Sequence, residues 1–326
     1  MKIRKIVTVV LGAVLLTSAI AGCGSKPETD SNAGDSQPSA AATEPETAAA
    51  SADPIRITEK SMTEQMILGE MLKLVIEDST DYTVEVTQGF ANDVTVVQAA
   101  LEKGEFDLYP EYTSTGWANV LGHSPAGVDD EEMFEQLNKE YNEQFDMSWI
   151  GRYGFNNTYA VVVRTDVADQ YNLKTTSDLA AVSDQLTFGA NSDYFEREDG
   201  YNLLAETYGF KFTDVKEFAE ISLRYAALKS GDIDVANGYT TDAQIGMGYC
   251  VALEDDLHLQ ANYYCSTVVR NEVLETHPGL EEALMKMDGM ISDAEMAQLN
   301  YQLEEEGKDE ADIAKAFLVE KGIIKG

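Results

Sequence analysis

The sequence predicts an α/β protein with two lobes and a cleft between them. The first observation is a repeated pattern, Leu-x-x-Gly-acid-apolar-Asp-apolar-x-x-x-Tyr, which occupies 101–112 and again 228–239. The two copies lie 127 residues apart (228 minus 101), which is too long for a solenoid repeat and indicates two lobes of similar build. The second observation is an alternation of strand-like and helix-like segments, which is typical of a largely parallel sheet flanked by helices.

Each copy of the pattern is expected to place its tyrosine at the end of a strand. The glycine is typical of a helix C-terminus, and the alternating apolar residues after it predict a short strand. Tyr112 and Tyr239 are each followed by hydroxyl residues, which favour the start of a helix. Ligands of open α/β sheets bind outside the carboxyl ends of the strands, so both tyrosines are candidate ligand contacts. A core position beneath a helix–strand joint would explain either tyrosine taken alone.

The remaining elements follow from apolar periodicity and capping signals. Ser61 and Glu64 have the spacing of a capping box at the start of the first helix, and Ser292 and Glu295 have the same spacing near the C-terminus. Strands are expected at 55–57, 82–87, 156–164, 186–188, near Val215, at 251–253 and at 267–270. Helices are expected at 61–75, 92–101, 133–145, from Ser177, at 200–208, at 224–228, and from His277 and Ser292 onward.

The N-terminal segment has the features of a bacterial lipoprotein signal. Residues 1–5 are basic, the apolar run 6–21 is too short for a stable membrane span, and Ile20-Ala21-Gly22-Cys23 fits a lipobox. Cys23 is therefore expected to carry the lipid that anchors the protein to the outer face of the cytoplasmic membrane; the alternative is an ordinary signal peptide with an incidental cysteine. The segment 24–53 contains no large apolar residue and is expected to form a disordered tether with a reach of about 30 Å.

Two crossings of the chain between the lobes are expected to form a hinge, the first near Phe155. The predicted regions are the signal peptide at 1–22, the lipid-anchored tether at 23–53, the first lobe at 54–155, the second lobe at 156–260, and a return to the first lobe with C-terminal helices at 261–326.

Charge and cysteine content limit the possible partners. The formal charge of −35 becomes −38 when Lys2, Arg4 and Lys5 are removed, and such an acidic protein repels nucleic-acid phosphates. The same charge would help docking onto basic loops of a protein partner. Cys250 and Cys265 could form a disulfide in an exported protein, but each lies among apolar residues where a buried thiol would pack equally well.

The sequence contains no recognisable catalytic or metal site. His123, His258 and His277 are scattered without metal-ligand spacing, and neither a G-x-S-x-G nucleophile elbow nor a phosphate-binding loop is present. Binding without chemistry, with no cofactor and no metal, is the simpler hypothesis.

Six segments in a fixed order resemble the type II extracellular solute-binding proteins of osmoprotectant ABC transporters, which capture glycine betaine, carnitine or choline. The resemblance covers the whole folded body and implies a two-lobed type II periplasmic-binding-protein fold, a lipoprotein that closes around its ligand, and partnership with an ABC permease and its ATPase subunits. The segments are Lys60–Gln65, Asp107–Thr115, Gly154–Tyr159, Glu196–Gly200, Gly231–Asp234 with Tyr239–Asp242, and Leu253–Asp256.

The same resemblance implies a tyrosine cage around a quaternary ammonium group. The matching positions are Tyr112, Tyr159, Tyr239 and Tyr263, with Tyr264 as the replacement if the alignment is shifted by one residue. Aromatic faces suit a trimethylammonium group because it has no N–H to donate, and each face contributes on the order of 1–2 kcal/mol when desolvated.

The resemblance also implies a polar subsite for the other end of the ligand. Arg197 would grip a betaine carboxylate through its planar fork, and Lys60 and Thr115 match further polar positions. Surface ion pairing for Arg197 and Lys60, and helix capping for Thr115, are the ordinary alternatives. Thr115 favours betaine or carnitine over choline, because choline-restricted members carry an aspartate there. Ser114 replaces the glycine usual in the family, which would strain the turn if that position required a positive φ.

Two other functions remain open at this stage. An amino-acid or polyamine receptor of the same fold would place acidic residues near the ammonium group of its ligand. An enzyme, for example an esterase acting on choline esters, would require a nucleophile–base pair that the sequence does not show.

Overall fold

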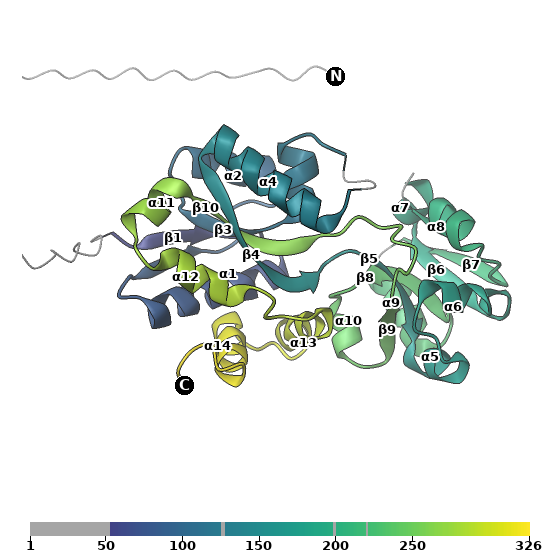
Figure 1. Ribbon diagram of the computed structural model, residues 1–326. Helices are drawn as coiled ribbons and strands as arrows, with labels where there is room; N and C mark the ends of the chain where they lie inside the picture. Colours follow the sequence, from purple (N-terminus) through teal and green to yellow (C-terminus); the bar gives the residue numbers. More distant parts are fainter. Residues whose placement is uncertain (1–52, 125–127, 198–199, 220) are drawn as a thin grey trace, which may run out of the picture. The chain divides into compact units, whose positions relative to one another are not determined.

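The computed structural model describes residues 53–124, 128–197, 200–219 and 221–326 (Figure 1). The predicted signal peptide, the lipidation residue Cys23 and nearly all of the predicted tether lie outside these residues. The described residues belong to one compact unit that spans 49–326. This unit contains two five-stranded sheets, each flanked by helices.

The first sheet has the strand order β2-β1-β3-β10-β4. Its strands are β1 (Ile55–Thr58), β2 (Val84–Thr87), β3 (Leu108–Tyr112), β4 (Met147–Asn156) and β10 (Tyr264–Arg270). The helices that accompany it are α1 (Thr63–Ser79), α2 (Val94–Glu102), α3 (Thr113–Thr115), a π-helical turn (Gly116–Val120), α4 (Asp130–Phe145), α11 (Asn271–Thr276), α12 (Leu280–Leu284), a 3-10 turn (Met285–Met287), α13 (Asp293–Glu304) and α14 (Glu310–Glu320).

The second sheet has the strand order β7-β6-β8-β5-β9. Its strands are β5 (Tyr159–Arg164), β6 (Thr187–Asn191), β7 (Asp214–Phe218), β8 (Val235–Tyr239) and β9 (Cys250–Leu253). The helices that accompany it are α5 (Thr165–Tyr171), α6 (Thr176–Ala180), a 3-10 turn (Ser183–Gln185), α7 (Ser192–Glu196), α8 (Tyr201–Tyr208), α9 (Ile221–Ser230) and α10 (Ala243–Gly246).

The sheets are mixed because the chain passes between them twice. In the first sheet, β1 pairs in parallel with β2 and β3, while β10 runs antiparallel to β3 and β4. In the second, β6 pairs in parallel with β7 and β8, while β5 runs antiparallel to β8 and β9. The chain moves to the second sheet between β4 and β5 and returns between β9 and β10, so the strands next to the crossings supply the antiparallel pairings.

The repeated sequence pattern supplies the central strand of each sheet, β3 in one and β8 in the other. Its glycines, Gly104 and Gly231, have φ values of +71° and +81°, a conformation that favours glycine at a helix C-terminus. Its second acidic residue forms an ion pair with an arginine at the end of the neighbouring antiparallel strand, Asp107 with Arg270 and Asp234 with Arg164 (N–O distances 3.3 and 3.8 Å).

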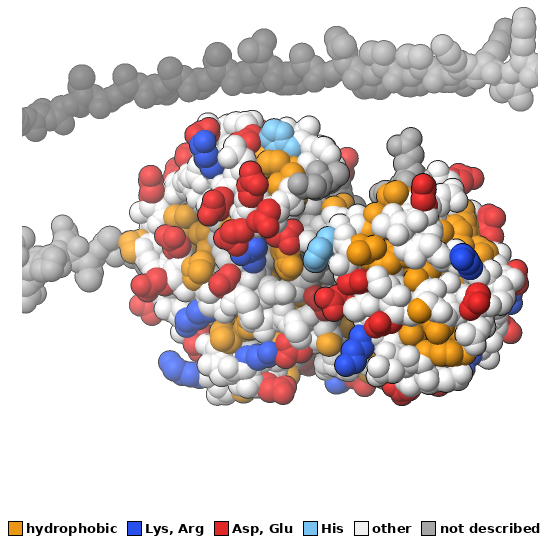
Figure 2. All heavy atoms as spheres, turned by 45° about the vertical axis from the view of Figure 1, so that its right-hand side comes forward, with side chains coloured by type: hydrophobic (Ala, Val, Ile, Leu, Met, Phe, Trp, Pro, Cys, Tyr) orange, Lys and Arg blue, Asp and Glu red, His pale blue; other side chains and the backbone are white. Residues whose placement is uncertain are grey.

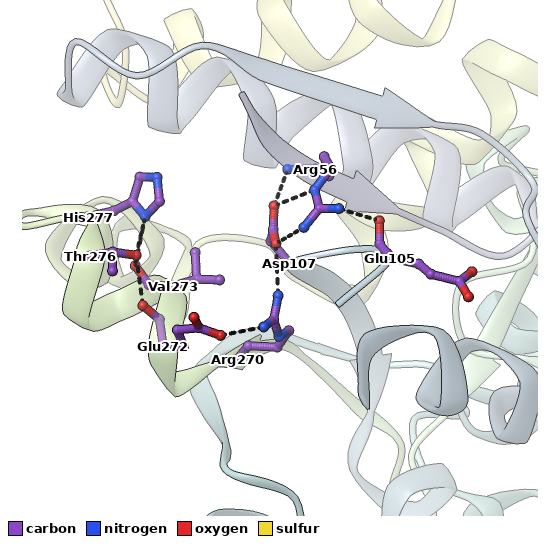
Figure 3. A network of polar contacts seen from close by, with 8 residues as sticks. All are labelled: Arg56, Glu105, Asp107, Arg270, Glu272, Val273, Thr276 and His277. Atoms are coloured by element: carbon purple, nitrogen blue, oxygen red, sulfur yellow. Dashed lines mark hydrogen bonds and ion pairs between the residues drawn. The ribbon is translucent and has the colours of Figure 1, made fainter. Parts of the chain in front are cut away.

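Asp107 also pairs with Arg56, and this second ion pair joins the start of β3 to β1. Arg56 Nη2 lies 2.6 Å from Asp107 Oδ1, and Arg270 donates to the same oxygen from the other side (Figure 3). The aspartate of the repeat therefore has a structural role in assembling the sheet, while the tyrosine at the opposite end of the strand remains available for a ligand.

Among the sequence-based expectations, one capping box is wrong, a second capping box is confirmed, and the state of the two cysteines is decided. The capping box at Ser61 and Glu64 does not form: the N-cap of α1 is Met62, Ser61 Oγ donates to the carbonyl of Gly89, and Glu64 is buried. The second capping box, Ser292 with Glu295, is confirmed. Cys250 and Cys265 are both buried free thiols, and they lie in different sheets, which excludes the disulfide between them.

Candidate ligand-binding cleft

A cavity of about 970 Å³ opens between the carboxyl ends of the two central strands, and all seven predicted ligand residues line it. Residues of both sheets contribute to its wall, together with the crossing segment and α13. The predicted residues at the cavity are Lys60, Tyr112, Thr115, Tyr159, Arg197, Tyr239 and Tyr263. Tyr264 does not line the cavity, and its ring lies 5.9 Å from the guanidinium carbon of Arg152.

Strand pairing places two of the four tyrosines face to face. Tyr159 and Tyr239 are register partners on the antiparallel strands β5 and β8. Their ring centroids lie 4.9 Å apart at an interplanar angle of 25°. Side chains of directly opposed residues point to the same face of a sheet, so this pair forms one aromatic wall contributed by the second sheet.

The first sheet contributes the opposite aromatic wall. Tyr112 ends β3, its ring is 5% exposed, and its hydroxyl donates a hydrogen bond of 2.5 Å to Glu64 Oε1. Tyr263 precedes β10, and its backbone N–H donates to Asn156 Oδ1 at 2.6 Å. Burial raises the pKa of Tyr112 well above its usual value, so its hydroxyl keeps its proton and donates it to the carboxylate.

Two basic side chains border the aromatic walls. The guanidinium carbon of Arg197 lies 5.7 Å from the centre of the Tyr159 ring, and the side chain is exposed. Lys60 is 5% exposed and its Nζ lies 2.6 Å from Glu111 Oε1 and 5.7 Å from the centre of the Tyr112 ring. Lys60 therefore lies at the cavity wall paired with a buried carboxylate, and Arg197 reaches the cavity from the C-terminal end of α7.

Ser114 causes no strain in the turn after Tyr112. It lies inside α3 and is not among the residues with positive φ, and its hydroxyl donates a hydrogen bond of 2.6 Å to the carbonyl of Asn262. The glycine expected at this position from the family resemblance is therefore not required for the backbone.

Carboxylates and amides also line the cavity wall and are not among the ligand residues predicted from the sequence. Glu64, Asp242 and Glu304 line the cavity with Asn157 and Asn300. Glu64 lies within the Lys60–Gln65 segment of the family resemblance, but its spacing from Ser61 predicts a helix cap and not a ligand contact. Its position on the cavity wall depends on its burial beside Tyr112, a residue that is distant in the chain.

Asp242 supports the loop that follows Tyr239. Its carboxylate accepts hydrogen bonds from the backbone N–H of Tyr239 (2.9 Å) and from the hydroxyl of Tyr225, and it lies 3.8 Å from the guanidinium of Arg224. Burial raises the pKa of the Asp242 carboxyl. These contacts fix the backbone that carries one cage tyrosine.

The part of the chain that the structure describes contains neither a metal-ligand cluster nor a candidate membrane span. There, no three histidine, cysteine or acidic residues lie close enough together to coordinate a metal ion. Among the same residues, no helix has the length and apolar character required for a membrane span. Figure 2 shows acidic side chains spread over the face of the molecule.

Residues 53–320 match the protein family described as the substrate-binding domain of ABC-type glycine betaine transport systems. The chain belongs to this family. The chain is therefore the substrate-binding component of an ABC importer for quaternary ammonium compounds. It acts on the extracytoplasmic side, and its role is transport and not enzymatic catalysis.

Individual relatives agree with the family assignment. The carnitine transport binding protein OpuCC of Listeria monocytogenes is 35% identical over 278 residues, which cover 85% of this chain and 89% of that protein. The ergothioneine transport permease/ergothioneine binding protein EgtU of Helicobacter pylori is 37% identical over 270 residues, which cover 83% of this chain and 48% of that protein. This chain thus spans about half the length of EgtU.

A solved structure described as a glycine betaine/carnitine/choline ABC transporter superposes with a TM-score of 0.77. The two sequences are 33% identical, and the match covers 83% of this chain and 100% of the other. The predicted type II periplasmic-binding-protein fold is thereby confirmed.

Proposed function

We propose that the protein captures a quaternary ammonium osmoprotectant, namely glycine betaine, carnitine or choline, in a cage formed by Tyr112, Tyr159, Tyr239 and Tyr263, and delivers it to its ABC permease. The observation that carries this proposal is the convergence of four tyrosines from both sheets on one cavity. These residues are up to 151 positions apart in the chain (263 minus 112), so their meeting is a property of the fold and not of sequence proximity.

The aromatic cage alone does not supply the binding free energy of a micromolar complex, so other parts of the ligand must also contribute. Four aromatic faces contribute on the order of 4–8 kcal/mol before the costs of binding are subtracted. A micromolar complex requires about 8 kcal/mol. In this proposal the difference comes from methyl contacts and from the carboxylate of the ligand, which Arg197 binds through its planar fork with Lys60 and Thr115 nearby.

Lobe closure follows from the positions of the proposed contacts. Tyr112 ends β3 and Tyr263 directly precedes β10 of the first sheet. Tyr159 and Tyr239 lie in strands of the second sheet, and Arg197 follows α7, which accompanies that sheet. A ligand that contacts both sets stabilises the closed arrangement more than the open one, so its binding raises the closed population. The hinge in this proposal is the pair of crossing segments, one between β4 and β5 next to Phe155 and one between β9 and β10 around the boundary 260/261.

Isothermal titration calorimetry of residues 49–326 tests the proposal. Glycine betaine, carnitine and choline are titrated separately, with lysine and putrescine as comparison ligands. Saturable binding of at least one quaternary amine, without binding of lysine or putrescine, is the expected result. Binding of lysine or putrescine alone would replace the proposal with an amino-acid or polyamine receptor.

That second candidate is favoured by one observation, the carboxylates on the cavity wall. Glu64, Asp242 and Glu304 could accept hydrogen bonds from a primary ammonium group. Glu64 and Asp242 are, however, already occupied by donors from the protein. This arrangement leaves less capacity for the N–H groups of lysine and is compatible with a trimethylated nitrogen, which donates none.

A larger betaine is a further ligand to include, because one relative is described as an ergothioneine binding protein. Ergothioneine carries both a trimethylammonium and a carboxylate group, so the same cage and the same arginine would hold it. Adding ergothioneine to the titration series ranks it against glycine betaine directly.

For the N-terminal region we propose removal of residues 1–22 and lipidation of Cys23, with residues 24–53 as the tether to the membrane. The lipobox pattern supports this proposal. Growth of an expressing bacterium with a labelled fatty acid should label the native protein and leave Cys23→Ser unlabelled. Equal labelling of both, or of neither, would contradict the anchor.

A further inference from the structure

Glu64 is a buried carboxylate on the cavity wall without a cationic partner. It is 3% exposed and lies in the first turn of α1. Within the described residues, no lysine or arginine lies within 4 Å of its carboxylate oxygens, whereas Glu111 is paired with Lys60 at 2.6 Å. Asp242, a second carboxylate on the cavity wall, has Arg224 at 3.8 Å. Glu64 therefore stands out among these three groups by lacking a nearby positive charge.

Neutral hydrogen-bond donors surround the carboxylate. Oε1 accepts hydrogen bonds from the hydroxyl of Tyr112 (2.5 Å) and from Nδ2 of Asn157 (3.0 Å), and Oε2 accepts a longer one from Nδ2 of Asn300 (3.4 Å). Burial raises the pKa of the Glu64 carboxyl above its ordinary value, whereas the hydrogen bonds that it accepts from these neutral donors oppose the rise and favour the charged form. Burying that charge without a counter-ion is costly, and a cation in the adjacent cavity would offset the cost.

The hydrogen bond from Tyr112 links this charge to the aromatic cage. A phenol that donates to a carboxylate is polarised toward its ring, and this polarisation makes the ring face more negative. Cation–π attraction depends on the negative face of the ring. The charge of Glu64 can therefore act on a bound ammonium group both directly and through the Tyr112 ring.

We propose that Glu64 is a specificity-determining residue of the cleft, whose buried carboxylate, hydrogen-bonded to Tyr112, makes the cage select a positively charged trimethyl group over a neutral group of the same shape. The proposal rests on the quaternary ammonium function proposed above. It assigns the discrimination of charge to Glu64 and leaves the recognition of shape to the tyrosine rings.

A matched pair of ligands separates charge from shape. Glycine betaine and 3,3-dimethylbutanoate differ in having nitrogen or carbon at the centre of the trimethyl group; choline and 3,3-dimethylbutan-1-ol form the equivalent pair if choline is the tighter ligand. Dissociation constants are measured for the wild type, Glu64→Gln and the control Glu135→Gln, which removes the same charge from an exposed position on α4. Thermal unfolding verifies that each variant is folded.

We expect Glu64→Gln to weaken binding of the charged ligand by about tenfold or more and to change binding of the carbon analogue by less than twofold. Glu135→Gln should leave both constants within twofold of the wild type. Equal weakening of both ligands by Glu64→Gln would overturn the proposal, because it would show a structural role only.

A second variant keeps the proposal testable if Glu64→Gln does not fold. Tyr112→Phe retains the ring and removes its hydrogen bond to Glu64, so it should lower the ratio of charged to neutral affinity in the same direction; an unchanged ratio would count against Glu64. Failure of the wild type to bind any of these ligands would instead refute the proposed function, so the two failures are distinguishable.

Discussion

Tyr159 and Tyr239 face each other across the antiparallel strands β5 and β8, with ring centroids 4.9 Å apart. Tyr239 is fixed by its backbone hydrogen bond to Asp242, and Tyr159 begins the strand that follows the first crossing between the sheets. Strand pairing therefore brings the two rings of this aromatic wall together, and each ring supports the position of the other.

Removal of one ring from this wall should weaken ligand binding. We expect Tyr239→Ala to raise the dissociation constant of the preferred quaternary amine by at least tenfold, because it deletes a cation–π face and the stacking partner of Tyr159. Tyr239→Phe keeps the face and should cost much less. Calorimetry measures both variants; an unchanged affinity in Tyr239→Ala would exclude this tyrosine from the cage.

The neighbouring residues Tyr263 and Tyr264 provide a test of the alignment. Tyr263 lines the cavity and Tyr264 packs near Arg152 outside it. Tyr263→Ala should weaken binding by about tenfold, while Tyr264→Ala should change it by less than threefold. The reverse order of effects would show that the fourth cage position is Tyr264.

Arg197 should distinguish ligands by their carboxylate. Arg197→Gln removes the guanidinium fork but not the aromatic contacts, and a charge-assisted hydrogen bond contributes on the order of 1.5–3 kcal/mol. We expect glycine betaine to lose affinity by at least tenfold and choline by less than threefold. A similar loss for both ligands would indicate that Arg197 stabilises the site and does not grip the carboxylate.

Glu59 should make stability depend on pH. Its carboxyl group is buried against α1, both oxygens lack a hydrogen-bond partner in the described part of the chain, and burial raises its pKa from 4.5 to about 8, with Glu70 and Glu310 adding repulsion. The folded protein then holds a proton that the unfolded chain releases near pH 4.5. This contribution to stability is present below about pH 4.5 and is lost as the pH rises through about 8.

Urea unfolding of the wild type and of Glu59→Gln at pH 5.5 and pH 8.5 measures this contribution. The wild type should lose on the order of 3 kcal/mol more than the variant between the two pH values, because the amide does not titrate. Parallel losses in the two proteins would show that Glu59 does not titrate in this range.

Local patterns account for what the sequence predicted well. The alternation of elements, the positive-φ glycines Gly104 and Gly231, and the strand-end placement of Tyr112 and Tyr239 depend on residues within about ten positions of one another. These features follow from backbone geometry and side-chain periodicity, which a short window of sequence contains. The family resemblance then extended the interpretation to positions such as Arg197 that no local pattern singles out.

Tertiary structure decided what depends on partners far apart in the chain. Glu64 has the spacing of a helix cap, yet it is buried against Tyr112 and Asn157, 48 and 93 residues away. Cys250 and Cys265 are only 15 positions apart (265 minus 250) but belong to different sheets. Burial, charge pairing and strand register arise from the packing of distant segments, so the sequence by itself determined the elements and their tyrosines, and only the fold determined which charges surround the cavity.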